Sequence, residues 1–152
     1  REGKDAVCSH IDEVLLASTF AGIAFANTGV GAVHALSYPL GGGYHVAHGE
    51  ANYAFFTAVL NRYEQLNPTG KITDLKGILK TALGMEAGDT AIQALATLLE
   101  QIIPLKRLRE YGMRQDEVDA FTDAAMAQER LMKNNYAALT RDDVRSIYEG
   151  RF

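Results

Sequence analysis

Cysteine is almost absent from this sequence, since Cys8 is the only one among 152 residues. A single cysteine forms no internal disulfide, which is typical of a reducing compartment, so we expect a cytoplasmic protein. Long apolar runs are lacking as well: no stretch approaches the roughly 20 residues of a membrane span, and we expect no membrane partner. At this length a single domain can bury a core without disulfides.

Concentrated positive charge is also lacking. The formal net charge is −4, and the 15 Lys and Arg residues are dispersed along the chain. The one basic cluster, Lys106–Arg109, is followed at once by Glu110, which favours a solvated helix face. Nucleic-acid binding needs a concentrated positive face, so we expect no nucleic-acid partner.

Strand-like alternation of apolar and polar residues is not sustained anywhere, and Gly41–Gly43 follows no strand that would make it a phosphate-binding loop. Helical spacing recurs instead, with capping-box patterns at Ser9–Asp12 and Thr140–Asp143. We therefore predict an all-α, multi-helix bundle. The expected helices are 12–26, a short helix through His34, 48–63, 73–83, 89–103, 115–132 and 140–150.

Three of the four histidines lie within residues 34–48, together with Pro39 and Gly41–Gly43. On one straight helix His34 and His48 would be about 21 Å apart. That is too far to share a metal ion, which each ring nitrogen must approach to about 2 Å. Because the residue before a proline avoids helical geometry, we expect one helix to end before Pro39 and the glycines to turn the chain back.

The spacing alone leaves two interpretations open. Either His34 and His48 converge on a metal, or His34 is a hydrogen-bonded core residue while His45 and His48 are polar loop residues. Two imidazoles make an incomplete site, because three or four protein ligands are usual for a transition metal. His10 has no ligand-like spacing to the others, and we interpret it as a surface residue.

The segment Ala17–Gly41, continued by His48–Asn52, resembles the signature of the iron-dependent (group III) alcohol dehydrogenases. The resemblance runs in unbroken register, so it is specific. Within this family, Tyr38 and the segment Tyr44–Tyr53 are most similar to the 4-hydroxybutyrate dehydrogenase branch. This resemblance favours the interpretation of His34 and His48 as metal ligands.

Enzymes of this family combine an N-terminal nucleotide-binding domain with a C-terminal helical domain, which holds divalent iron or zinc through one aspartate and three histidines. The resemblance implies that residues 1–152 are an incomplete C-terminal metal-binding domain, without the domain that binds most of the NAD(P). His34 and His48 match the last two metal-binding histidines. Nothing matches the aspartate and the first histidine, because His10 and Asp12 lie too close to the signature.

The resemblance also implies a chemistry. The metal acts as a Lewis acid on the substrate oxygen, and hydride passes between the carbinol carbon and the nicotinamide. Phe25 matches an aromatic position near the nicotinamide, although core packing explains it as well. Tyr38 stands where many members carry a proton-relaying histidine. We expect it to orient the substrate, with His45 as a second candidate for proton traffic.

We therefore expect part of an NAD-dependent enzyme that interconverts 4-hydroxybutyrate and succinate semialdehyde, and that is inactive as this fragment alone. The substrate is a small alcohol or aldehyde; the carboxylate of a hydroxy acid would need a cation from outside the histidine segment. Two alternatives stay open. One is a non-catalytic helical oligomerisation domain, which would favour a homodimer. The other is a small metal-binding protein that uses His34, His45 and His48.

Overall fold

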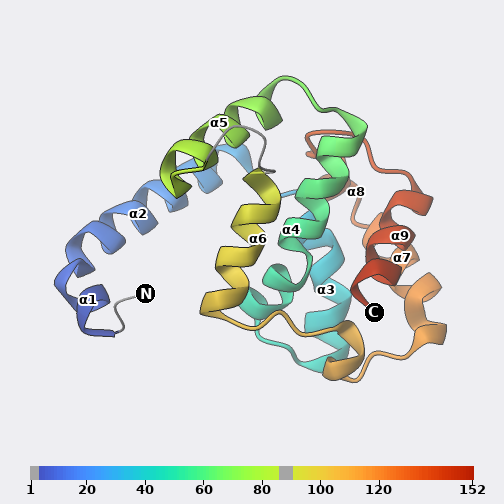
Figure 1. Ribbon diagram of the computed structural model, residues 1–152. Helices are drawn as coiled ribbons and strands as arrows, with labels where there is room; N and C mark the ends of the chain where they lie inside the picture. Colours follow the sequence, from blue (N-terminus) through green and yellow to red (C-terminus); the bar gives the residue numbers. More distant parts are fainter. Residues whose placement is uncertain (1–3, 86–90) are drawn as a thin grey trace. The chain divides into compact units, whose positions relative to one another are not determined.

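The structure is a computed structural model that describes residues 4–85 and 91–152, and the regular elements of this part are all helices (Figure 1). The prediction of an all-α protein is therefore confirmed. The helices form two compact units, one ending at Val30 and the other running over Gly31–Phe152. The first unit contains α1 (Lys4–Ser9) and α2 (Ile11–Thr28).

In the first unit, the predicted capping box at Ser9 is wrong. Ser9 is the last residue of α1, and its hydroxyl donates back to the carbonyl of Ala6 at 2.7 Å instead of capping the next helix. His10 takes the N-cap position of α2, but its side chain makes no capping hydrogen bond. The glycine after this helix predicts its end, and α2 is indeed followed by Gly29 with φ 73°, whose N–H donates to the carbonyl of Phe25 at 2.9 Å.

The second unit contains the other elements in the described part of the chain. They are α3 (Ala32–Tyr44), α4 (His48–Leu66), α5 (Lys71–Leu83), α6 (Ala91–Ile102), the 3₁₀ helices η1 (Leu108–Tyr111) and η2 (Gln115–Glu117), α7 (Val118–Met126), α8 (Glu129–Met132) and α9 (Arg141–Arg151). Helix α3 packs against α4, α7 and α8, while α9 packs against α4 and α7. These helices form one core, and α5 and α6 pack on each other beside α4 (Figure 1).

Tyr148 of α9 lies at the centre of this core. It is fully buried, and its ring contacts the rings of Phe55 and Phe121 at centroid distances of 5.2 and 5.9 Å, both edge to face. Its hydroxyl donates to the carbonyl of Leu36 at 2.7 Å. Burial raises the pKa of Tyr148, so the hydroxyl stays protonated and remains a donor. One side chain thus joins α9 to α3, α4 and α7.

Helix α3 does not end before Pro39, and this prediction is wrong. The helix continues through Pro39 and Gly41–Gly43 to Tyr44. Leu36 and Leu40, on either side of the proline, are fully buried, and the Tyr148 hydroxyl supplies a donor to the carbonyl of Leu36. Core packing therefore stabilises a helix that local propensity would end. The chain turns at His45 instead, which has left-handed geometry (φ 54°, ψ 30°).

The remaining helix boundaries are mostly as predicted. Helix α4 begins at His48, and α9 opens with the predicted capping box, in which the Thr140 hydroxyl accepts from the N–H of Asp143. The predicted helix over 115–132 is instead η2, α7 and α8, because Gln128 leaves helical geometry (ψ 58°). The expected start of the helix over 89–103 lies outside the described residues.

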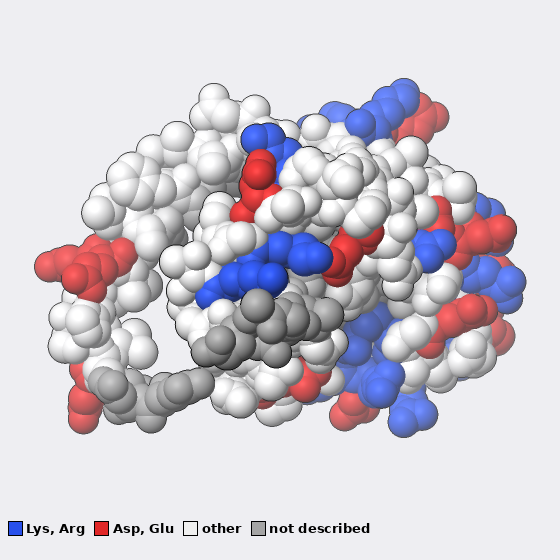
Figure 2. Space-filling view, turned by 45° about the horizontal axis from the view of Figure 1, so that its top comes forward, with Lys and Arg blue, Asp and Glu red and all other residues white. Residues whose placement is uncertain are grey.

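Charge and apolar character are distributed differently over the molecule. On the face that Figure 2 shows, basic and acidic side chains of the second unit lie interspersed, whereas α2 is almost entirely uncharged apart from its acidic start. Among the described residues, no single helix is both long and apolar enough to cross a membrane. Helices α2 and α3 meet that test only when taken together.

Candidate metal centre

The second unit brings His34 and His48 together. His34 lies in the first turn of α3, and His48 is the first residue of α4, which returns alongside α3. Their ring centroids are 5.1 Å apart. The expected convergence is therefore found, although the chain turns after α3 rather than at the proline.

Asn52 lies between the two imidazoles. Its amide nitrogen is 3.3 Å from Nε2 of His34 and 3.0 Å from Nε2 of His48. The amide oxygen accepts from the hydroxyl of Ser37 at 2.6 Å. Both ring Nε2 atoms therefore face one point, which is the arrangement that two ligands of a single metal ion need.

Tyr38 completes the cluster on the side of α3. It lies four residues after His34 on the same helical face, as predicted, and its ring centroid is 6.4 Å from the rings of both His34 and His48. The tyrosine is 39% exposed, so its phenol remains accessible to a small molecule.

A cavity of about 280 Å³ opens beside this cluster. Its lining has small and apolar residues, and among the described residues no lysine or arginine contributes to it. The lining residues are Ser37, Tyr38, Gly41, Gly42, Val46, His48 and Ala51. The cavity can therefore admit a small molecule next to His48 and Tyr38, but it offers no cation to a carboxylate.

The pKa of His34 is lowered, first because the ring is partly buried and second because of repulsion from His48. Lowering the pKa keeps the ring neutral at neutral pH. A neutral imidazole has a lone pair on one nitrogen and is the form that binds metal ions. The electrostatics of the pair therefore suit a metal ligand.

Three further histidine and aromatic positions lie outside the cluster. His45 is exposed at the C-cap of α3, and no hydrogen bond or ring contact within the described residues joins it to His34 or His48. His10 is exposed and bonded to Glu13 at 2.6 Å, as expected of a surface residue. Phe25 belongs to α2 in the first unit and is 53% exposed, and its place beside a nicotinamide stays a prediction.

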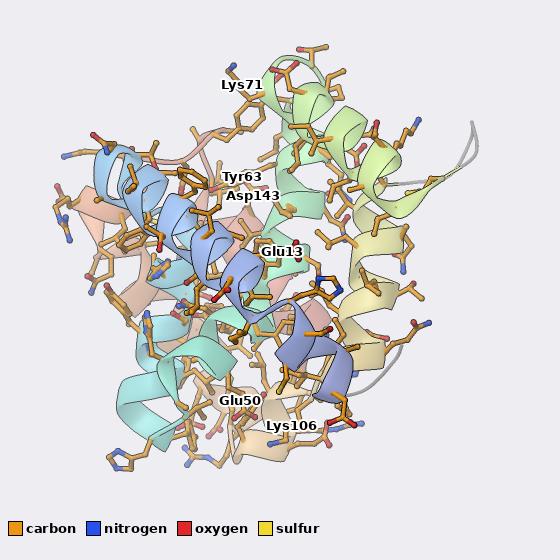
Figure 3. All side chains as sticks on the ribbon, turned by 90° about the vertical axis from the view of Figure 1, so that its left-hand side faces the viewer. Glu13, Glu50, Tyr63, Lys71, Lys106 and Asp143 are labelled. Carbon is orange, nitrogen blue, oxygen red and sulfur yellow. The ribbon has the colours of Figure 1, made fainter. Side chains whose placement is uncertain are left out.

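His34 and His48 provide only part of the ligands that a metal ion needs, which we call a half-site. In the described part of the chain, no three His, Cys, Asp or Glu side chains gather where they could hold one metal ion. Glu50, two residues after His48, is engaged elsewhere: it pairs with Lys106 at 2.8 Å (Figure 3), and this hydrogen bond lowers its pKa. Lys106 is itself exposed and precedes η1, so the basic cluster is solvated as predicted but does not lie on one helix. A self-contained site built from His34, His45 and His48 is not formed.

Two polar residues of this site escaped the sequence analysis. Asn52 appeared only as part of the family signature, and Ser37 only within the helix around His34. A signal for Asn52 did exist, because it follows His48 by four residues on a predicted helix and therefore shares its face. No comparable signal pointed to Ser37, whose role depends on the packing of α3 against α4.

Comparison with known proteins shows the family to which this chain belongs. Residues 1–152 match the model of the Fe-containing alcohol dehydrogenase family, C-terminal. The chain is 45% identical over 149 residues to "4-hydroxybutyrate dehydrogenase" of Clostridium kluyveri, covering 97% of this chain and 40% of that protein. It is 34% identical over 139 residues to "Long-chain-alcohol dehydrogenase 1" of Geobacillus thermodenitrificans, covering 89% of this chain and 35% of that protein.

The fold has a counterpart among solved structures. The crystal structure of a 1,3-propanediol oxidoreductase matches with a TM-score of 0.72 and 27% identity, covering 90% of this chain and 36% of that one. The chain thus spans well under half the length of the relatives that it matches. The family model matches the whole length of the chain. The chain therefore belongs to the Fe-containing alcohol dehydrogenase family and corresponds to the C-terminal part of its members.

Proposed function

We propose that this chain forms the metal-binding part of an NAD-dependent alcohol dehydrogenase that interconverts 4-hydroxybutyrate and succinate semialdehyde. The observation that carries the proposal is the convergence of Nε2 of His34 and Nε2 of His48 on one point beside an open cavity. The choice of substrate rests on the 45% identity to the Clostridium kluyveri protein.

In this proposal, His34 and His48 supply two of the ligands of a divalent iron or zinc ion, which when bound polarises the oxygen of the alcohol or aldehyde. The other ligands come from elsewhere in the complete enzyme, as does most of the NAD(P) site. Phe25 would contact the nicotinamide of the bound cofactor. The residues of the chain otherwise position the substrate and exclude water from it.

Tyr38 orients the substrate. Its phenol can donate a hydrogen bond to the substrate oxygen, because the ring stands beside both histidines and next to the cavity. In this role Tyr38 acts through its phenol O–H as a hydrogen-bond donor. Proton exchange with solvent falls to His45, which is exposed on the turn that follows α3.

A hydroxy-acid substrate needs a cation for its carboxylate, and the lining of the cavity provides none among the described residues. The proposal therefore places the carboxylate outside the cavity, toward a basic residue of the complete protein. The alcohol end, which is small and uncharged, occupies the cavity beside Tyr38 and His48.

A metal titration under anaerobic conditions tests the proposal on the chain itself, with ferrous iron or zinc. Two imidazoles without further ligands should bind weakly. We expect this weak binding to disappear in His34→Ala and in His48→Ala. It should persist in His10→Ala, the matched control at the N-cap of α2. Binding that survives His34→Ala or His48→Ala unchanged would contradict the proposed ligands, whereas no binding at all would agree with a site that lacks its other ligands.

Activity requires the rest of an enzyme, and a chimera can supply it. In the chimera, this chain replaces the matching 40% of the Clostridium kluyveri protein. We expect NAD-dependent oxidation of 4-hydroxybutyrate, lost in His48→Ala and kept in His10→Ala. A chimera that retains its metal but prefers another alcohol would overturn the substrate assignment.

Tyr38→Phe in the same chimera tests the role of the phenol. Loss of one hydrogen bond to the reacting oxygen should lower kcat about tenfold or more, with little change in metal content. If kcat and KM both stay at the level of the unsubstituted chimera, Tyr38 does not orient the substrate.

A further inference from the structure

Asn52 is the residue that physically connects the two histidines. It is partly buried on α4, one helical turn after His48, so the helix itself places it beside that ring. The packing of α4 against α3 then brings the same side chain to His34 and Ser37. One amide thus contacts three side chains from two helices.

The hydroxyl of Ser37 fixes the orientation of the Asn52 amide. The Ser37 hydroxyl lies 2.6 Å from Oδ1 of Asn52, and Ser37 is only 1% exposed. A hydroxyl that donates to Oδ1 directs the amide nitrogen away from itself and toward the two imidazoles. Ser37 sits in the buried face of α3, so the orientation is fixed by the core rather than by the surface.

An amide nitrogen can only donate hydrogen bonds, and it has two hydrogens to donate. Nε2 of His34 and Nε2 of His48, at 3.3 and 3.0 Å from it, must therefore both be acceptors. A neutral imidazole that accepts at Nε2 carries its proton on Nδ1. Both rings are then in the same tautomer, with their Nε2 lone pairs directed at one point.

We propose that Asn52 is a positioning residue that holds His34 and His48 in the Nδ1–H tautomer, with both Nε2 atoms directed at the point where a metal ion binds. The amide contacts both Nε2 atoms and is displaced from them when a metal takes their lone pairs. The part of this inference that concerns metal binding rests on the proposed function. The part that concerns the tautomers does not.

The tautomers can be measured directly. In the metal-free chain labelled with ¹⁵N at histidine, two-bond N–H correlations distinguish a protonated Nδ1 from a protonated Nε2. We expect His34 and His48 to show Nδ1–H in the unsubstituted chain. In Asn52→Ala the Nε2–H form should appear at both rings. Asn52→Asp offers only acceptor oxygens and should shift both rings toward Nε2–H more completely than alanine does.

Two controls separate this effect from a general loss of structure. Asn61→Ala makes the same substitution in the same helix but away from the histidines, and it should leave both tautomers unchanged. Ser37→Ala removes the group that orients the amide and should shift the tautomers in the same direction as Asn52→Ala, but less. Tautomers in Asn52→Ala that match those of the unsubstituted chain would overturn the inference.

Metal affinity provides the second readout. A ring protonated at Nε2 must give up that proton to bind a metal there, so Asn52→Ala should bind ferrous iron or zinc more weakly than Asn61→Ala. If His48→Ala abolishes binding while Asn52→Ala leaves affinity and tautomers unchanged, the inference fails and the proposed function survives. If His48→Ala leaves binding unchanged, the proposed function fails whatever the tautomers show.

Discussion

Helices α2 and α3 follow each other in the chain and are both apolar and rich in small residues, yet they differ completely in burial. In the described structure, no residue of α2 is buried, whereas five residues of α3 are. Apolar composition therefore predicted a helix in both cases, but it did not predict burial. The small residues of α2, such as Ala17, Ala21 and Gly22, predict a helix that is buried on most sides, and within the described residues this prediction is wrong.

The difference comes from the partners that each helix finds. Helix α3 packs against α4, α7 and α8, and it receives a hydrogen bond from Tyr148 of α9. These partners come from segments up to more than a hundred residues away in the chain. Burial is a property of such long-range contacts, and α3 can tolerate Pro39 because of them.

The largest effect should come from truncating the centre of the core. Tyr148→Ala removes a fully buried aromatic ring that contacts Phe55 and Phe121, and we expect the free energy of unfolding to fall by about 3 kcal/mol or more. Phe20→Ala, at a 62% exposed position of α2, should change it by less than about 0.5 kcal/mol. Urea denaturation measures both. A similar cost for the two would show that α2 is covered in solution.

Asp143→Ala should have the next largest effect. Asp143 accepts from the guanidinium of Arg62 and from the N–H of Thr140, at 2.8 and 2.7 Å, and we expect a loss of about 2 kcal/mol. Burial raises the pKa of Asp143, but the hydrogen bonds from Thr140 and Arg62 outweigh it, and the net pKa is lowered. The stabilisation is therefore present above about pH 4 and is lost as the pH falls through the folded-state pKa.

That pH dependence can be checked with the same variant. The free energy of unfolding of the unsubstituted chain should fall faster below about pH 4 than that of Asp143→Ala, because only the former loses the Asp143 contribution. Parallel curves for the two chains would show that Asp143 has the same pKa folded and unfolded.

Gly31→Ala tests the start of α3. A Cβ at Gly31 would lie 2.7 Å from Oδ1 of Asn135, and this oxygen accepts from the N–H of Ala32 and the hydroxyl of Tyr63 at 2.7 and 2.8 Å. We expect a loss of about 1–2 kcal/mol in thermal or urea unfolding. Gly22→Ala in α2 meets nothing within 4 Å and should not lower stability, since alanine favours a helix. Equal losses of stability in the two variants would contradict the difference in burial between α2 and α3.

The smallest effect concerns the turn after α3. His45 has φ 54°, a conformation that costs a residue with a Cβ about 1 kcal/mol relative to glycine, so His45→Gly should raise the free energy of unfolding by up to about 1 kcal/mol. The same variant in the chimera tests the proposed proton traffic. Stabilisation with unchanged turnover would leave His45 as a turn residue alone.

The sequence predicted much of the fold because most helix ends are local. Gly29 at the end of α2 and Thr140 at the start of α9 act through hydrogen bonds within a few residues, and such signals can be read from the chain. The errors arose where distant packing decided the outcome. Pro39 lies inside α3, and Ser9 ends a short helix instead of capping the next one.

The candidate site was predicted in part for the same reason. His34, Tyr38 and His48 were found from spacing and from the family signature, and the structure brings them together. Asn52 was missed because its role lies in a contact between two helices. His45 lies at the turn outside the cluster, and its part in proton traffic stays a prediction.

By itself, the sequence determined the helical class, the family and the identity of the two converging histidines, because these depend on periodicity and on a contiguous motif. Only the tertiary structure decided that α3 continues through its proline and that one amide lies between the two imidazoles. Both outcomes depend on side chains of different helices meeting in the core, and the free energy of such contacts outweighs the local preference of any single residue.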